Sequence, residues 1–341
     1  MEEKYKRPVI LWLATGALLV VIMVVVGGIT RLTHSGLSMV DWKPLTGILP
    51  PISDADWQAE FDNYKNYPEF QKINFDFTLD DFKSIYWWEF VHRILGRLLG
   101  VAFIVPFVFF LYKRVFDKAM IKKLLVLLFL GGLQGFLGWF MVKSGLKDNP
   151  AVSHYRLAIH LVAAFGLFSY ILWMIMDIAG FRKTGAPSQV KGGTWILLVF
   201  VVLQIVYGAF VAGLKAGLFY NTWPLMGGEL ISGIISQAWG AKGVTGLFED
   251  QVTIQFIHRW LPLAVLGCLV WLWMKKGGED IHKRPLVFLW AVFVLQFLLG
   301  VFTLLLQVPV WLGVLHQLGG LALLSGTVWL IYAIQPGERG H

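Results

Sequence analysis

Two short stretches decide how this chain is organised: Glu89-Phe-Val-His92-Arg93 and, in its second half, Gln255-Phe-Ile-His258-Arg259. Each opens a long apolar segment. Other pairs recur in the same order, which makes the chain a tandem repeat of four segments per unit. These pairs are His160 and His316, each with Ser nine and Trp thirteen residues further on, and Gln134-x-x-x-Gly138 and Gln296-x-x-x-Gly300.

Composition sets the class of protein. The 341 residues are 57% hydrophobic and only 15% charged, whereas a soluble domain is nearer half apolar and a quarter charged. The 26 Phe and 16 Trp exclude disorder, and the single Cys268 excludes a fold held by internal disulfides. The net charge of +8 does not indicate nucleic acid, because the basic residues lie in short clusters between apolar runs.

Eight segments are long and apolar enough to cross a bilayer, which takes about 20 residues. The last charge-free run is too long for one helix, so we expect it to break near Pro309, since proline cannot continue a helix. The predicted helices cover residues 8–30, 85–112, 124–142, 157–176, 192–214 and 252–274, with two more between 285 and 337.

The charges of the connecting loops predict the orientation. Both ends and every second connection together hold 16 Lys and Arg against 7 Asp and Glu, and the other side holds 13 against 14. Positively charged loops stay in the cytoplasm. Both termini are therefore expected on the cytoplasmic or matrix side, with the long 31–84 and 215–251 loops outside. Their Trp and Pro content indicates structured caps.

The predicted fold is thus an all-α integral membrane protein with eight transmembrane helices. An even number of helices per unit gives both halves the same orientation, so two four-helix bundles are expected, related by a pseudo-twofold axis along the membrane normal. The bundles are assigned to residues 1–185 and 186–341.

Four of the eight histidines, His92, His160, His258 and His316, lie inside predicted spans at positions that the repeat matches. Histidine in a span is uncommon and usually functional, although a hydrogen-bonded packing role is the alternative. Zinc would want three or four ligands together. Haem is bound by axial histidine ligands in a flat apolar site, so two histidines per bundle favour haem iron.

Small residues accompany these histidines and suit a flat ligand lying against the backbone, although they also suit close helix contacts. His258 is an exception, because Pro262 follows it and a kink would have to make the space. The small residues are Gly96, Ala163, Ala164, Gly319 and Gly320.

Arginines also stand beside the histidines. Arg93 and Arg259 follow theirs directly, and Arg156 is four residues before His160. Guanidinium groups bind carboxylates in bidentate fashion, so these three are predicted to bind the haem propionates. The alternative is that they extend to lipid headgroups.

The two halves differ where Glu89 stands opposite Gln255. A carboxyl group one turn before His92 can give or take a proton, which an amide cannot do. This difference suggests chemistry in the first half and a fixed cofactor in the second. A helix ion pair between Glu89 and Arg93 is an equally weighted alternative.

These motifs identify the chain as similar to the haem A synthase family over essentially its whole length. It looks closest to the branch without cysteine pairs in the outer loops, which includes mitochondrial and many Gram-negative enzymes. The specific motifs are 27–33, 35–39 with Trp42, Pro44 and Gly47, then Glu89-x-x-His92-Arg93, Tyr155-Arg156 with His160, 255–259, and Leu315-His316-Gln317.

The resemblance implies an oxidoreductase that hydroxylates the C8 methyl of haem O twice and forms the formyl group of haem A. It implies that His258 and His316 ligate a permanent haem b, that His92 and His160 bracket the substrate haem, and that Glu89 is the catalytic carboxylate. Its expected partners are haem O, a haem O synthase (protohaem farnesyltransferase), an electron donor and the lipid of a bacterial or mitochondrial inner membrane. Whether copies of the chain form a homo-oligomer stays open.

Two alternatives remain from the residues themselves. One is a dihaem b-type membrane cytochrome that transfers electrons without modifying haem, and the other is a transporter or haem conduit. The difference between Glu89 and Gln255 favours the enzyme, because a simple carrier needs no such difference.

Overall fold

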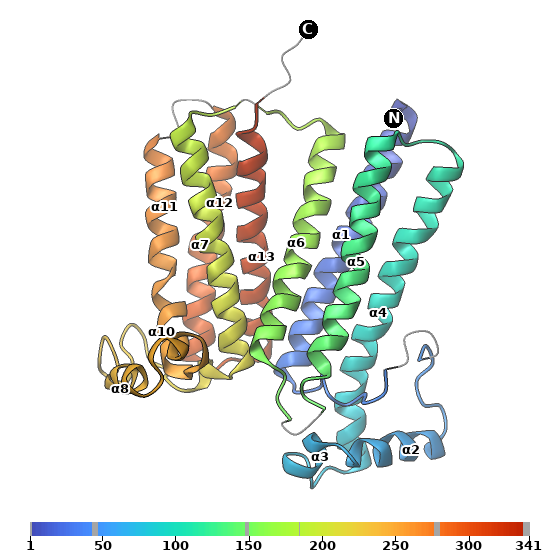
Figure 1. Ribbon diagram of the computed structural model, residues 1–341, viewed down its shortest axis with the longest axis vertical. Helices are drawn as coiled ribbons and strands as arrows, with labels where there is room; N and C mark the ends of the chain where they lie inside the picture. The colour runs from blue at the N-terminus through green and yellow to red at the C-terminus, as the bar shows by residue number, and fades with distance from the viewer. Residues whose placement is uncertain (1, 43–46, 147–149, 184, 276–279, 337–341) are drawn as a thin grey trace. The chain divides into compact units, whose positions relative to one another are not determined.

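The computed structural model describes residues 2–42, 47–146, 150–183, 185–275 and 280–336, with the side chains of 280–282 left out (Figure 1). Pro44 of the motif region therefore lies outside the described residues. In the described part, eight helical spans are long and apolar enough to cross a membrane, as the sequence predicts. They are α1 (Glu3–Leu32), α4 (Leu79–Tyr112), α5 (Lys118–Val142), α6 (His154–Ala179), α7 (Ser188–Gly213), α10 (Gln251–Trp260) with α11 (Pro262–Lys275), α12 (Asp280–Leu305) and α13 (Val310–Ala333).

Proline breaks two of the apolar runs, one near Pro309 where the sequence predicts a break and one at Pro262 where it predicts only a kink. Pro309 caps the start of α13, and the two residues before it, Gln307 and Val308, have the positive φ angles of 61° and 59° that end α12. Pro262 begins α11 after Leu261, so the sixth span consists of two helices. Proline has no N–H to continue the hydrogen-bond ladder of the helix before it.

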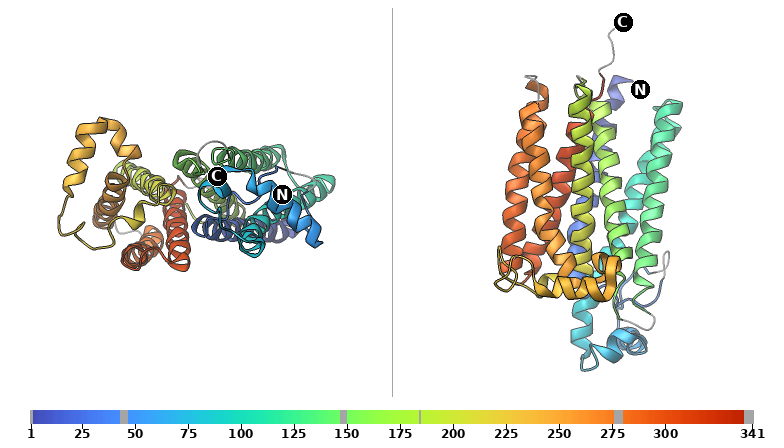
Figure 2. Two further views of the ribbon diagram at one scale, coloured as in Figure 1. Left: turned by 90° about the horizontal axis from the view of Figure 1, so that it is seen from below. Right: turned by 60° about the vertical axis from the view of Figure 1, so that its left-hand side comes forward.

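The chain divides into two compact units, residues 1–167 and 168–341, with the division inside α6. In the first unit α4 packs against α1 and α5. In the second, α7 packs against α10, α11 and α13, and α12 packs against α13, as both views in Figure 2 show. The boundary at residue 185 drawn from the sequence repeat remains a prediction.

The long connection between α1 and α4 in the first unit folds into an aromatic cap. It carries α2 (Asp54–Lys65) and α3 (Pro68–Lys72), which pack on the start of α4. Ser53 caps α2 by accepting a hydrogen bond from the N–H of Asp56 at 3.1 Å. Tyr64 is fully buried, and burial raises the pKa of its phenol above the ordinary value. The cap core consists of Val40, Trp57, Phe61, Tyr64, Phe82, Ile85, Tyr86 and Phe90.

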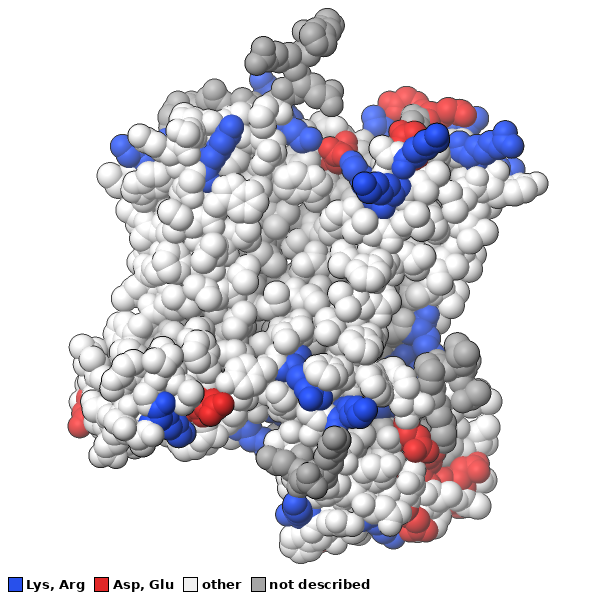
Figure 3. Space-filling model, viewed as in Figure 1, with Lys and Arg blue, Asp and Glu red and all other residues white. Residues whose placement is uncertain are grey.

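The second unit carries its own cap between α7 and α10. It contains η1 (Ala216–Leu218), α8 (Gly233–Lys242), η2 (Gly243–Thr245) and α9 (Gly246–Glu249). The expectation that both long connections are structured is therefore confirmed in their described residues, and their outward position stays a prediction. On the face shown in Figure 3, charged side chains gather near the two ends of the helices and uncharged side chains cover the band between, as a bilayer requires.

Close packing of α12 against α13 predicts the effect of one added methyl group. A Cβ atom at Gly326 would lie 2.8 Å from Cδ1 of Phe288 and 2.9 Å from Cδ2 of Leu289. Overpacking of this kind costs roughly 1–3 kcal/mol, so Gly326→Ala is expected to lower the Tm of the purified protein in detergent. Gly267→Ala is the control, because nothing lies within 4 Å of its new methyl group. Equal loss of Tm in both variants would contradict the packing argument.

Candidate functional site

Each of the four histidines of the spans faces a glycine of the preceding transmembrane helix. A side chain at any of these glycines would meet the imidazole ring, so each glycine provides the space that a ring occupies. A Cβ atom would lie 3.2 Å from the His92 ring at Gly27, 3.2 Å from the His160 ring at Gly138, 3.0 Å from the His258 ring at Gly208 and 2.9 Å from the His316 ring at Gly300.

In three cases a glutamine one turn before the glycine also binds the histidine. The Nε2 of Gln134 donates to the carbonyl oxygen of His160 at 3.0 Å and lies 3.2 Å from its Nδ1. The Nε2 of Gln204 donates to the carbonyl oxygen of His258 at 3.0 Å and lies 3.1 Å from its Nδ1. Gln296 donates to the carbonyl oxygen of His316 at 2.9 Å.

Gln204 is the residue that the sequence analysis missed. The repeat uses Gln134 and Gln296 only as markers, although Gln204-x-x-x-Gly208 has the same spacing and indicates a third copy. Gln-x-x-x-Gly is therefore a motif that holds a histidine of the following helix.

The second unit brings His258 of α10 and His316 of α13 face to edge. Their ring centroids lie 6.1 Å apart with the planes at 90°. Metal–imidazole bonds are about 2 Å long, so two rings on opposite sides of one metal ion have centroids about 6 Å apart. The spacing fits a metal held by two imidazoles.

The first unit brings His92 of α4 and His160 of α6 near enough for their charges to interact. Among the described residues, no three His, Cys, Asp or Glu side chains gather as ligands of one ion. The histidines thus form one pair in each unit.

Not all of the small residues beside the histidines leave open space. A Cβ atom at Gly319 would collide with Oε1 of Gln296, so this glycine is needed for contact between α12 and α13. A Cβ atom at Gly96 would lie 3.8 Å from Cε of Met23 on α1. The helix-contact alternative therefore accounts for Gly319.

Glu89 lies at the centre of a buried polar network in the N-terminal third of α4. Its side chain accepts hydrogen bonds from Nη2 of Arg93 at 2.7 Å, from Oγ of Ser38 at 2.8 Å and from the N–H of Met39 at 2.8 Å. Only 3% of Glu89 is exposed. The ion pair that the sequence offered as an alternative is thus present within α4. The hydrogen bonds from Ser38 and Met39 tie α4 to the loop after α1.

Arg93 and Arg259 both bind backbone carbonyls of the loop that follows the preceding transmembrane helix. Arg93 donates to the carbonyl oxygens of Asp41 at 2.8 Å and Met39 at 2.6 Å. Arg259 donates to those of Thr222 at 2.8 Å and Tyr220. The repeated arginine therefore anchors the loop after the preceding transmembrane helix in each unit, and the predicted contact with a propionate stays a prediction for both.

Gln255 replaces Glu89 in the second unit and has a weaker anchoring role. Its Nε2 donates to the carbonyl oxygen of Tyr220 at 3.2 Å, and its buried Oε1 has no partner in the described part of the chain. The second network is therefore neutral apart from Arg259, whereas the first contains a closed ion pair.

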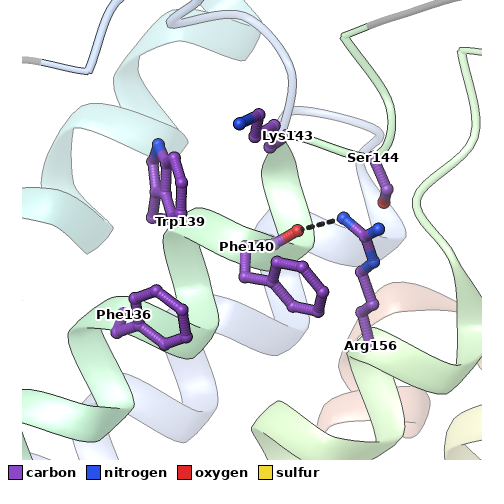
Figure 4. Close-up of a pocket in the computed structure, with 6 residues that line it drawn as sticks. All are labelled: Phe136, Trp139, Phe140, Lys143, Ser144 and Arg156. Atoms are coloured by element: carbon purple, nitrogen blue, oxygen red, sulfur yellow. Dashed lines mark hydrogen bonds between the residues drawn. The ribbon is translucent and has the colours of Figure 1, made fainter.

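Arg156 differs from the other two arginines because it lines a pocket (Figure 4). Its Nη1 donates to the carbonyl oxygen of Phe140 at 2.7 Å, and its guanidinium lies 3.7 Å from the centroid of the Phe140 ring. The pocket measures about 440 Å³, and Lys143 adds a second cation. Two cations beside aromatic walls suit a flat anionic molecule. Its other walls are Phe136, Trp139 and Ser144.

Comparison with known proteins places this architecture in a family. The profile of the cytochrome oxidase assembly protein family (COX15-CtaA) matches residues 10–328. Haem A synthase of Flavobacterium johnsoniae is 47% identical over 97% of this chain and 99% of its own length. That of Parvibaculum lavamentivorans is 44% identical over 95% and 93% of the two chains, and that of Nitrosospira multiformis 40% identical over 98% and 96%. The chain belongs to the cytochrome oxidase assembly protein family.

Proposed function

We propose that this protein is a haem A synthase, an oxidoreductase that converts haem O to haem A. The observation that carries the proposal is similarity to haem A synthases over nearly the full length of both chains, at 40–47% identity. The paired histidines support it, since a haem substrate needs a site with axial ligands. The C8 methyl of haem O would be hydroxylated twice, and the resulting geminal diol would lose water to give the formyl group.

The residues of the second unit fit a permanent haem b. His258 and His316 would be its axial ligands, because the 6.1 Å between their ring centroids suits a metal between them. The buried Nδ1 of His316 has no partner among the described residues. Hydrogen bonding therefore positions His316 through its backbone carbonyl oxygen, which accepts from Gln296, and helix packing positions its ring. The chemistry supplied by a bound haem b is electron transfer.

In the first unit His92 and His160 would hold the haem O substrate. Arg156 and Lys143 would bind its propionates in the pocket they line. Arg93 and Arg259 would chiefly hold the outer loops closed over the two sites, as their carbonyl contacts favour.

Glu89 would be the catalytic carboxylate. It stands one turn before His92, and its buried position strengthens its interactions with neighbouring charges. Its carboxylate is paired with Arg93 at 2.7 Å, so Glu89 would give or take a proton at the substrate's oxygen when that ion pair loosens.

The two units would be four-helix bundles related by a pseudo-twofold axis, covering residues 1–185 and 186–341. We place the protein in the inner membrane with both termini on the cytoplasmic side, as the loop charges favour. A haem O synthase would supply the substrate, and a separate electron donor would serve the second unit.

The Glu89–Arg93 ion pair also favours a second candidate, a dihaem b-type cytochrome that leaves haem unmodified. A carboxylate fully used in an ion pair and two hydrogen bonds has a sufficient structural role. The two candidates differ in product.

Co-expression with a haem O synthase tests the proposal. Haem extracted from the cells and identified by chromatography and mass is expected to carry the formyl group. Accumulation of unmodified haem O beside a folded, haem-loaded protein would contradict the enzyme and support the electron carrier.

Glu89→Gln is expected to keep bound haem and to lower formation of the formyl product by about 100-fold or more, the usual worth of an acid–base group. The amide has the same size but cannot take up a proton. Ser38→Ala is the matched control, because it removes a hydrogen bond from Glu89 and leaves the carboxylate. Normal product formation by Glu89→Gln would reduce Glu89 to an ion-pair partner.

His258→Ala and His316→Ala are each expected to abolish the low-spin spectrum of a bis-histidine haem in the second unit. Each removes one of two axial ligands. His154→Ala serves as the control, since His154 starts α6 outside the paired positions. An unchanged low-spin spectrum in the first two variants would show that other residues hold this haem.

A further inference from the structure

A row of aromatic rings joins α10 to α12 in the second unit, through the connection between α7 and α10. The ring of Trp223 in this connection lies 5.7 Å from that of Phe297 on α12 and 5.9 Å from that of Trp260 on α10, measured between centroids. The row continues from Phe297 to Phe293 and from Trp260 to Phe256, each at 6.4 Å. We call these five rings the aromatic bridge. Ring pairs at such distances attract one another beyond the apolar area that they bury.

The aromatic bridge stands beside the histidine pair of the second unit. Trp260 is two residues after His258, and Phe297 directly follows Gln296, whose amide donates to the carbonyl oxygen of His316. The rings therefore close the side of the unit between α10 and α12 at about the height of the two histidines.

The first unit has smaller side chains at the corresponding positions. A Cβ atom at Gly131 or Gly135 would meet no atom of the described residues within 4 Å, so neither glycine serves close contact with a neighbouring helix. Two rings on α12 and one on α10 thus have no counterpart in the first unit. By the repeat, Ile94 corresponds to Trp260, Gly131 to Phe293 and Gly135 to Phe297.

The outer part of the same side is also loosely packed. Within α5 the buried side chains are Leu124 and Leu127, both in the first third of the helix, far from Gly138 and the His160 ring. A pocket of about 150 Å³ lies between α4, the end of α5 and the loop after α1. Trp42, the counterpart of Trp223, is one of its walls and is 45% exposed. The first unit is therefore open between α4 and α5 where the second unit is bridged.

We propose that the aromatic bridge retains the haem of the second unit, and that its absence lets the substrate haem enter and leave the first unit between α4 and α5. The inference rests on the proposed function, since it takes one haem as a cofactor and the other as a substrate. Packed rings must separate before a flat molecule can pass between two helices, whereas glycines leave the passage free. A cofactor that stays and a substrate that is exchanged need these two arrangements.

The alternative is that the rings only stabilise the packing of α10 and α12, and that the glycines only contact lipid. A purely structural role predicts that loss of one ring lowers the Tm without changing the rate at which haem leaves the folded protein. The test therefore exchanges residues between the two units and measures haem transfer.

The experiment uses the full-length protein in lipid nanodiscs with haem b bound in both units, and follows haem transfer to excess apomyoglobin by absorbance. A fast phase is expected from the first unit and a slow phase from the second, which His316→Ala removes. Phe297→Gly is expected to speed the slow phase by about tenfold or more, because truncation of a packed aromatic side chain removes much of its packing energy. Phe302→Gly, which removes a 52% exposed ring of the same helix, is the matched control and is expected to change neither phase.

Gly135→Phe provides the converse test, because it adds a ring where the structure has room. It is expected to slow the fast phase and to leave the slow phase unchanged. Gly132→Phe is its control, since the new side chain also meets nothing within 4 Å and the counterpart of Gly132, Val294, is 51% exposed.

Equal rates of haem transfer for either variant and its control, with full haem content at the start, would overturn the inference. Failure of the proposed function looks different: co-expression with a haem O synthase would then give no formyl product, whatever the rates of haem transfer.

Discussion

The contact between a glycine and an imidazole ring is the constraint on which both units depend. Four times a histidine ring lies against the backbone of the preceding transmembrane helix, where an added Cβ atom would crowd the ring at 2.9–3.2 Å. This contact fixes how closely two helices approach and at what height the ring sits. The glycines make this geometry sterically possible, and the hydrogen bonds of the glutamines and of the arginine-bound loops stabilise it.

The two units share this packing of histidine on glycine but surround it with different polar groups. The first has a buried carboxylate in an ion pair with Arg93, and Met23 one turn before the glycine that faces His92. The second has Gln255 and Gln204 at the corresponding positions. A buried charge is costly unless it is paired, so Glu89 makes the first unit dependent on its loop to a degree that the second is not. A reactive site and a permanent cofactor site would differ in this way.

Much of this was predictable from the sequence because apolar length and proline are local signals. The eight spans, the break near Pro309 and a kink at Pro262 follow from them. The pairing of His258 with His316 followed from the repeat. The roles of Arg93 and Arg259 did not follow from the sequence. Their partners are backbone carbonyls of distant loops, and every residue type carries such a carbonyl. Glu89 shows the same limit, since spacing predicted both an ion pair and a proton donor.

The break at Pro262 has a consequence for the histidine one turn earlier. In an unbroken helix the carbonyl oxygen of His258 would accept from the N–H of residue 262, and proline has none. Gln204 donates to that carbonyl instead, at 3.0 Å. The two positions are therefore interdependent: the proline removes a backbone donor inside a bilayer, and a side chain from the neighbouring helix replaces it. A relative that lost this glutamine while keeping the proline would bury an unpaired carbonyl in a medium that offers no water.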